Sequence, residues 1–423
     1  MKLSDGPNGA RGGTFDHGKP AACVSLAASW DSELAVRIGK GMAEDATTNG
    51  VRLLLGPTVC LHRRPTGGRN FESFSEDPFL TGKLASKYIE GLQSKGIGAA
   101  VKHFAANEQE THRFTIDRHV SERALREIYL KPFEIAVKAA DPWAIMTSYN
   151  LLNGSYVDEN KHLLTGLLRE QWGGFQGLIM SDWGSVHSTS ASLNAGHDLE
   201  MPGPGYYTRR RLPILCRLSR LFPEPIIPPE SSIDRPEHRQ LIRQAGADGM
   251  VLLKNSGILP LKENELKSIA LLGFAKEYLG HGGGSAAVNS QRKITPFKAF
   301  PEALKGDVEL RYAEGARTWR IFPPLQKYDD EKQPGHTMRV FSSDSPEQCT
   351  TSRIYKLWYQ SVGVPGIKRI TVTGTFRPRA SASIISVSIR WETQRFILND
   401  EKVFEDMRPT ADLIARNKIG MIL

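Results

Sequence analysis

The strongest constraint on the fold is an alternation, between residues 50 and 200, of short apolar runs with longer amphipathic stretches. This pattern is typical of repeated strand–helix units around a parallel sheet, and it predicts an α/β protein. We expect strands at 51–55, 98–102, 144–148 and 177–181. Apolar residues recur at helical spacing at 79–92, 125–136 and 163–168, and Pro132 should kink the second helix.

Chemically capable side chains follow three of these strands directly. Lys102 and His103 end the second run, Tyr149 and Asn150 follow the third, and Asp182 with Trp183 follows the fourth. In a (β/α)8 barrel the C-terminal ends of the strands form the active-site face. A barrel with a site at this face is therefore predicted.

Composition narrows the class of protein further. With 423 residues, of which 40% are hydrophobic, the chain can bury the cores of two or three domains. No apolar run reaches the roughly 18 residues of a membrane span, and MKLSDGPNGARGG lacks a signal-peptide core. We expect a soluble chain without membrane partners, and both secreted and cytoplasmic locations stay open.

The charge and the cysteines point to neither nucleic acid nor metal. Much of the net charge of +9 comes from five arginines between 209 and 220, in a Pro-rich stretch without interleaved aromatics, so no nucleic-acid partner is expected. The four cysteines are widely spaced and form no CxxC pair, which argues against a zinc site. No metal or organic cofactor is expected.

The pattern changes twice after residue 203. Residues 209–229 hold five Arg and five Pro with one acid, which is typical of a linker. A helix and then strands at the apolar runs 250–254 and 268–274 are expected next, which predicts a second α/β domain with a glycine loop at 282–285. Beyond about 310 the period becomes two, as at 370–376 and 385–391, which predicts a β-sandwich.

Several motifs together resemble the family-3 glycoside hydrolases, especially fungal β-glucosidases. They include SDGPNGARG, GPTVCLHRRPTGGRNFESFSEDP, KHF, MTSYNLLNG, LIMSDWGSVHST and NAGHDLEMPGP, almost continuously from 4 to 205. DGMVLLKNSGILPL and HGGGSAAVNS resemble that family's α/β sandwich, and the period-two segment resembles its protective-antigen-type β-sandwich insert. The domains implied are a (β/α)8 barrel at 1–205, an atypical linker at 206–236, a partial α/β sandwich at 237–310 and a partial all-β sandwich insert at 311–423.

The resemblance implies a retaining exo-β-glucosidase that releases terminal glucose from β-glucoside oligosaccharides. Retention needs a carboxylate and an acid about 5 to 5.5 Å apart, one on each face of the anomeric carbon. Asp182 matches the nucleophile, and Trp183 offers an aromatic face for a sugar ring. The positions that match the family's sugar-binding residues are Asp5, Arg69, Lys102, His103 and Tyr149.

The family's acid/base is a glutamate beyond the insert, and no residue of this chain matches it. The family's N-terminal helix is also missing, so we expect a fragment whose activity is weak or nil. Linkage preference and oligomeric state stay open.

Other functions stay open beside this one. A carbohydrate-binding remnant without turnover would keep the sugar site alone. The N-acetylhexosaminidase branch would need a catalytic His in the loop AANEQETHR, where His112 stands outside that branch's pattern. A Schiff-base aldolase would need a desolvated Lys102. Arg69 could instead pair structurally with Glu72 or Glu76.

Overall fold

The computed structural model divides the chain into two units, Met1–Glu314 and Gly315–Leu423. The residues it describes are 2–11, 22–203, 230–231, 233–276, 284–286, 288, 292–304 and 308–315, with the backbone of six further strands between 336 and 405. The two units are described separately below.

A six-stranded parallel sheet forms the centre of the first unit. Its strands, in spatial order, are β1 (Leu3–Asp5), β2 (Leu53–Leu55), β3 (Gly98–Phe104), β5 (Ala144–Thr147), β8 (Leu178–Trp183) and β9 (Leu199–Met201). Spatial order equals chain order, and every neighbouring pair is parallel, as successive strand–helix units require. The α/β class and the four predicted strands are confirmed. Among the described residues the sheet ends at β1 and β9 and does not close on itself.

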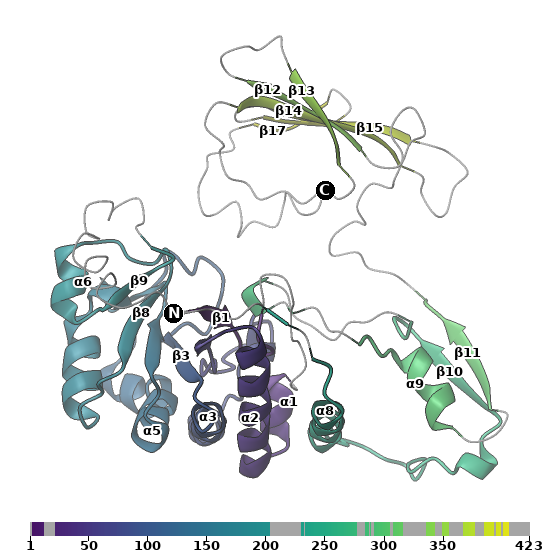
Figure 1. Cartoon of the computed structure of the whole chain (residues 1–423), viewed down its shortest axis with the longest axis horizontal. Coiled ribbons are helices and arrows are strands. Elements are labelled where there is room, and N and C mark those ends of the chain that lie inside the picture. Colours follow the sequence, from purple (N-terminus) through teal and green to yellow (C-terminus); the bar gives the residue numbers. More distant parts are fainter. Residues whose placement is uncertain are drawn as a thin grey trace. The chain divides into compact units, whose positions relative to one another are not determined.

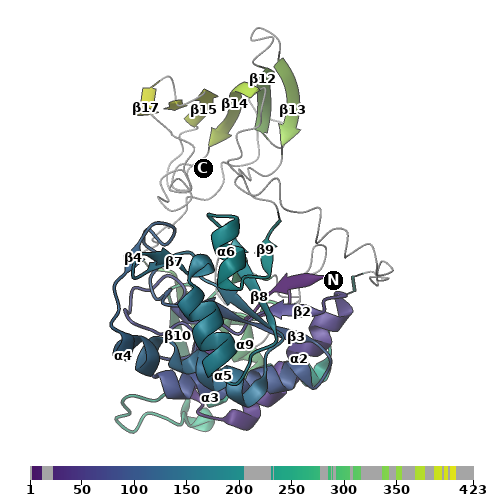
Figure 2. The same ribbon diagram turned by 90° about the vertical axis from the view of Figure 1, so that its left-hand side faces the viewer.

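Helices line one face of this sheet. Figure 1 shows α5 (Lys131–Ala140), α3 (Pro78–Gln93) and α2 (Ser32–Thr48) side by side beneath the strands, and Figure 2 shows the same row from the side. The carboxylate of Asp31 accepts hydrogen bonds from the backbone N–H groups of Glu33 and Leu34 in the first turn of α2. The carboxylate of Asp77 accepts one from the backbone N–H of Leu80 in α3. A further short helix, α1 (Cys23–Ala28), packs near α3, and the apolar residues between helices and strands form the main core.

The predicted kink at Pro132 takes the form of a break between two helical segments. α4 (Glu122–Ala124) passes into a widened turn at Leu125–Tyr129, and α5 begins after Leu130. Pro132 therefore lies in the first turn of a helix, where its missing N–H has no intrahelical acceptor to lose. The predicted helix at 163–168 is confirmed within a helical segment at His162–Gln171.

A smaller α/β portion follows the central sheet in the chain. α8 (Pro236–Asp248) packs on α1 and α2, and its residue Ala245 is buried. β10 (Ser268–Leu272) pairs in parallel with β11 (Glu309–Ala313), and α9 (Pro296–Ala303) lies beside this pair (Figure 1). β11 extends across the expected boundary at 310 because its residues pair with β10.

One strand expectation for this portion is wrong. The apolar run 250–254 forms no strand, and Leu253 is 92% exposed. A strand needs a partner for its backbone, and among the described residues β10 and β11 pair only with each other.

The second unit contains an antiparallel sheet of six strands. Their order is β13 (Cys349–Ile354), β12 (His336–Ser342), β14 (Ile367–Phe376), β15 (Ile385–Glu392), β16 (Arg395–Leu398) and β17 (Glu401–Glu405). The period-two segments at 370–376 and 385–391 are thus confirmed as strands, paired with each other.

Three expectations fall partly or wholly beyond the described residues. The arginine cluster at 209–220 and most of the expected linker at 206–236 lie outside them, as do Gly282 and Gly283 of the glycine loop. Within the part of the chain that the structure describes, no helix is long and apolar enough to cross a membrane.

Candidate active site

The parallel sheet brings the sequence-predicted site residues to one edge. Because parallel strands end on the same side, Asp5 of β1, Lys102 and His103 of β3, and Asp182 of β8 meet there, with Arg69 on the loop after β2. A cavity of about 330 Å³ lies at this edge. It is lined by all seven predicted residues, Asp5, Arg69, Lys102, His103, Tyr149, Asp182 and Trp183. Asn150 is buried elsewhere and donates to the carbonyl of Ala105.

Asp182 lines the cavity and has one carboxylate oxygen without a hydrogen-bond partner among the described residues. Its Oδ1 accepts the backbone N–H of Trp183 at 2.7 Å, which holds the carboxylate in place. Its Oδ2 is buried, lies 3.5 Å from Nε2 of His103, and has no hydrogen-bond partner among the described residues. A buried carboxylate oxygen is normally bonded, so this atom lacks a partner that the described residues do not supply.

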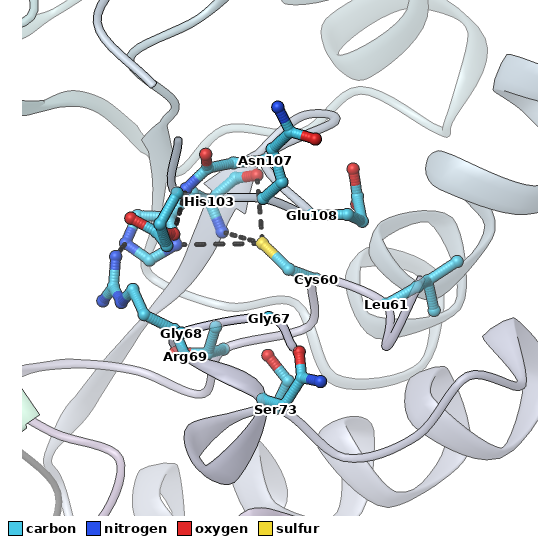
Figure 3. Close-up of a pocket in the computed structure, with 13 residues that line it drawn as sticks. Cys60, Leu61, Gly67, Gly68, Arg69, Ser73, His103, Asn107 and Glu108 are labelled. Atoms are coloured by element: carbon cyan, nitrogen blue, oxygen red, sulfur yellow. Dashed lines mark hydrogen bonds between the residues drawn. The ribbon is translucent and has the colours of Figure 1, made fainter. Parts of the chain in front are cut away.

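His103 lies in the site as a neutral imidazole. Burial lowers its pKa well below the usual range, and the positive charges of Arg69, Lys102 and Arg113 lower it further. Nε2 accepts from Nη1 of Arg69 at 3.2 Å, so the ring proton belongs on Nδ1, which lies 3.8 Å from Sγ of Cys60. Figure 3 shows the ring between the guanidinium and the sulfur. Cys60 thus supports the tautomer in which Nε2 accepts.

Arg69 serves both the site and the structure around it. It forms an ion pair with Glu72, which is buried, so the structural pairing that the sequence left open is present. Burial by itself lowers the pKa of Arg69, but Glu72 outweighs it and the pKa is raised. The guanidinium is therefore a permanent cation, anchored through Glu72 and directed at His103.

Lys102 and Asp5 also line the cavity. The ammonium of Lys102, only 2% exposed as a residue, donates to the carbonyl of Gly6 at 3.3 Å and keeps two further donors. Asp5 lies 3.8 Å from Arg11, and burial raises its pKa against the influence of Lys102 and Arg11. These charged groups can exchange hydrogen bonds with sugar hydroxyls.

Aromatic and cationic groups complete the lining. The ring of Tyr149 packs edge-on against Phe114, and the guanidinium of Arg113 lies 4.6 Å from its centroid. Burial and the nearby carboxylate of Asp182 raise the pKa of Tyr149. Trp183 lines the cavity and is 46% exposed.

Sequence reasoning missed four residues of the lining, Arg11, Arg113, Met146 and Ser285. Arg113 belongs to the loop 105–113 that the sequence singled out for His112, but His112 is exposed and does not line the cavity. The sequence did hold a signal for Arg113: it is a basic residue in the loop after β3, and β3 ends in site residues. Among the described residues no cluster of three or more His, Cys, Asp or Glu could hold a metal.

Comparison with known proteins matches two stretches of the chain to one family. Residues 9–218 match the glycosyl hydrolase family 3 N-terminal domain, and residues 250–401 match the glycosyl hydrolase family 3 C-terminal domain. The chain therefore belongs to glycosyl hydrolase family 3.

Similar proteins carry β-glucosidase names. The chain is 51% identical over 378 residues to beta-glucosidase B of Emericella nidulans, and this alignment covers 82% of the chain and 44% of the relative. It is 33% identical to a Kluyveromyces marxianus β-glucosidase solved in complex with glucose, with a TM-score of 0.75 over 96% of this chain and 54% of that one. β-Glucosidase 3B of Thermotoga neapolitana, solved with α-D-glucose, is 39% identical, with a TM-score of 0.64 over 74% of this chain and 47% of that one. The chain thus spans about half the length of these relatives.

Proposed function

We propose that this chain carries the nucleophile and the glucose-binding site of a retaining exo-β-glucosidase. In this proposal Oδ2 of Asp182 attacks the anomeric carbon of a terminal glucose, and the bond to the leaving-group oxygen breaks on the opposite face. The observation that carries the proposal is the buried, unbonded Oδ2 in a cavity lined by cations and aromatic rings.

The other lining residues bind the sugar. Asp5, Lys102 and Arg69 exchange charge-assisted hydrogen bonds with hydroxyls, which orient the ring against Asp182. His103 and Tyr149 close the wall behind the sugar, and Trp183 offers its open face to a sugar ring. The names of the relatives, and the glucose complex of the Kluyveromyces marxianus protein, support glucose as the bound unit.

The domain organisation belongs to the same proposal. The six parallel strands are the described part of a (β/α)8 barrel domain at 1–205. A linker at 206–236 follows this domain. The portion at 237–310 is part of an α/β sandwich, and 311–423 is part of a β-sandwich insert. The match of residues 250–401 to the family's C-terminal domain supports a separate domain after the linker, and it runs across the proposed division at 310.

A non-catalytic sugar-binding role is a second candidate, and one observation favours it. Asp182 and Asp5 are the two carboxyls that line the cavity in the described part of the chain, and Asp5 lies next to Arg11 and Lys102. Neither of these two carboxyls is therefore identified as an acid that could protonate the leaving group. A site without such an acid would bind glucose but would not turn over efficiently.

Trapping of the nucleophile separates the two. A 2,4-dinitrophenyl 2-deoxy-2-fluoro-β-glucoside needs no protonation of its leaving group, so it should label the peptide at 181–183, as read by mass spectrometry. Asp182→Asn should take up no label. A label on another carboxyl refutes the nucleophile, and calorimetric glucose binding without any label favours the binding protein.

A further inference from the structure

A second carboxyl, Asp158, lies buried behind the cavity and has no part in the proposed chemistry. It is 1% exposed and belongs to the short helical turn Val157–Glu159. It does not line the cavity that holds Asp182. A buried carboxyl is costly unless it is bonded, so its partners reveal what it holds.

Three side chains from different segments meet at Asp158. Thr147, at the end of β5, donates its hydroxyl to Oδ1. Ser185, on the loop after β8, donates to Oδ2 at 2.7 Å. Nε2 of His197, just beyond α6 (Ser190–Ala195), lies 3.5 Å from Oδ1. The carboxyl therefore joins β5 to the chain on the far side of β8.

Two of these partners also contact the backbone of β8, one at Met180 and the other at Asp182. The hydroxyl of Thr147 lies 3.2 Å from the carbonyl of Met180, two residues before Asp182. The backbone N–H of Ser185 donates to the carbonyl of Asp182 itself, at 3.3 Å. Asp158 is thus connected to the strand end that carries Asp182 from both directions.

The protonation state of Asp158 fits this arrangement. Burial raises its pKa to about 7, against the hydrogen bonds from Thr147 and Ser185, and the negative charge of Asp182 adds to the rise. The single hydroxyl hydrogen of Thr147 can serve Asp158 or Met180 at one time. A protonated Asp158 can donate to Thr147, which leaves that hydrogen for the carbonyl of Met180.

We infer that Asp158 is a positioning residue, which holds the end of β8 and the following loop so that Oδ2 of Asp182 faces the sugar. The inference rests on the proposed role of Asp182 as nucleophile. Asp158 acts through Thr147 and Ser185 and does not itself touch the substrate. Loss of this support should slow the attack by about ten- to hundredfold, because small displacements of reacting groups cost about that much.

The test compares Asp158→Ala with a matched control in the full chain. Glu159→Gln removes a carboxylate in the same turn but leaves the bonds to Thr147 and Ser185 intact. The labelling rate of Asp182 by the 2,4-dinitrophenyl 2-deoxy-2-fluoro-β-glucoside is measured against reagent concentration. We expect the maximal rate to fall about ten- to hundredfold in Asp158→Ala, with the half-saturating concentration changed less than about twofold. Glu159→Gln should match the parent.

Each outcome decides a different statement. A folded Asp158→Ala protein that labels at the parent rate overturns the inference, with the nucleophile still supported. A parent chain that labels another carboxyl overturns the proposed function and the inference together. Should Asp158→Ala not fold by circular dichroism, Ser185→Ala breaks the bond on the far side of β8. A parent-like maximal rate in Ser185→Ala then overturns the inference, and a fall at unchanged half-saturation supports it.

Discussion

Under the proposed function, single side chains decide whether this cavity holds a sugar. Oδ2 of Asp182, the donors of Lys102 and the guanidinium of Arg69 act on one small volume, although they are up to 113 positions apart in the chain. Each is restrained by a second contact, with Trp183, Gly6 and Glu72 respectively. A site of this kind is sensitive to the loss of one hydrogen bond.

Replacement of Lys102 should weaken glucose binding. Lys102→Met keeps the buried stem but removes the ammonium, and a charge-assisted hydrogen bond is worth roughly 1.5 to 3 kcal/mol, or about ten- to hundredfold in affinity. Isothermal titration calorimetry with glucose measures the change, and Lys87→Met on the exposed face of α3 is the control. Unchanged affinity in a folded Lys102→Met protein would show that the residue is structural.

Glu108 should make stability depend on pH. Burial raises its pKa to about 7, against the bond from the backbone N–H of Leu61, whereas an unfolded glutamate titrates near 4.3. Because its pKa is raised in the folded state, Glu108 makes its full contribution to the stability of the folded protein below about pH 4. This contribution is lost as the pH rises through 7. Glu108→Gln does not titrate, so its unfolding free energy relative to the parent should be higher at pH 8 than at pH 4.5, by up to about 3 kcal/mol.

Urea unfolding at the two pH values measures this difference. Glu90→Gln, at an exposed site paired with Lys87, should show little change between them. If the unfolding free energies of Glu108→Gln and the parent differ by the same amount at both pH values, the raised pKa of Glu108 is contradicted.

Among the elements, the pair α2 and α3 sets how closely the helical layer packs under the sheet. Gly39 and Gly91 allow the two backbones to touch: a Cβ on Gly39 would lie 2.3 Å from the carbonyl oxygen of Tyr88, and one on Gly91 would lie 2.3 Å from that of Val36. Backbone atoms cannot yield as a flexible side chain can, so this contact requires glycine on both sides.

Two substitutions in the same helix test this contact. Gly39→Ala should destabilise the protein by about 1 to 3 kcal/mol or more, because the helices must separate. Gly41→Ala should leave stability equal or raise it by up to about 1 kcal/mol, because its Cβ would meet Leu241 at 3.7 Å, an ordinary contact, and alanine favours the helix. Thermal unfolding of both variants gives the comparison. Equal effects would show that the helices are not limited by this contact.

For the whole molecule, the proposed function predicts which substrates are cleaved, because no acid for the leaving group is identified among the described residues that line the cavity. General acid catalysis typically contributes about 10²- to 10⁴-fold, and a good leaving group makes it dispensable. The chain should therefore cleave 2,4-dinitrophenyl β-glucoside far faster than cellobiose. Steady-state rates on the two substrates measure this. Cleavage of cellobiose at an ordinary enzymatic rate, on the order of 10 s⁻¹, would show that an acid lies within these residues.

The sequence alone determined the class of fold and seven of the eleven residues that line the cavity. Period and strand length identified the strands at the centre of the sheet, because alternation of apolar runs with amphipathic helices leaves few other arrangements. Residues at strand ends, such as Asp182 and Lys102, could be singled out for the same reason, since parallel strands end at one edge.

Tertiary structure decided what local pattern does not encode. The run 250–254 has the composition of a strand but no partner, and Arg113 lines the cavity although its loop pointed to His112. Likewise Asp158 reads as an ordinary polar residue, and only the meeting of β5 with the loop after β8 buries it and raises its pKa. Pairing, burial and the state of a proton depend on neighbours distant in the chain, and local periodicity carries no information about those.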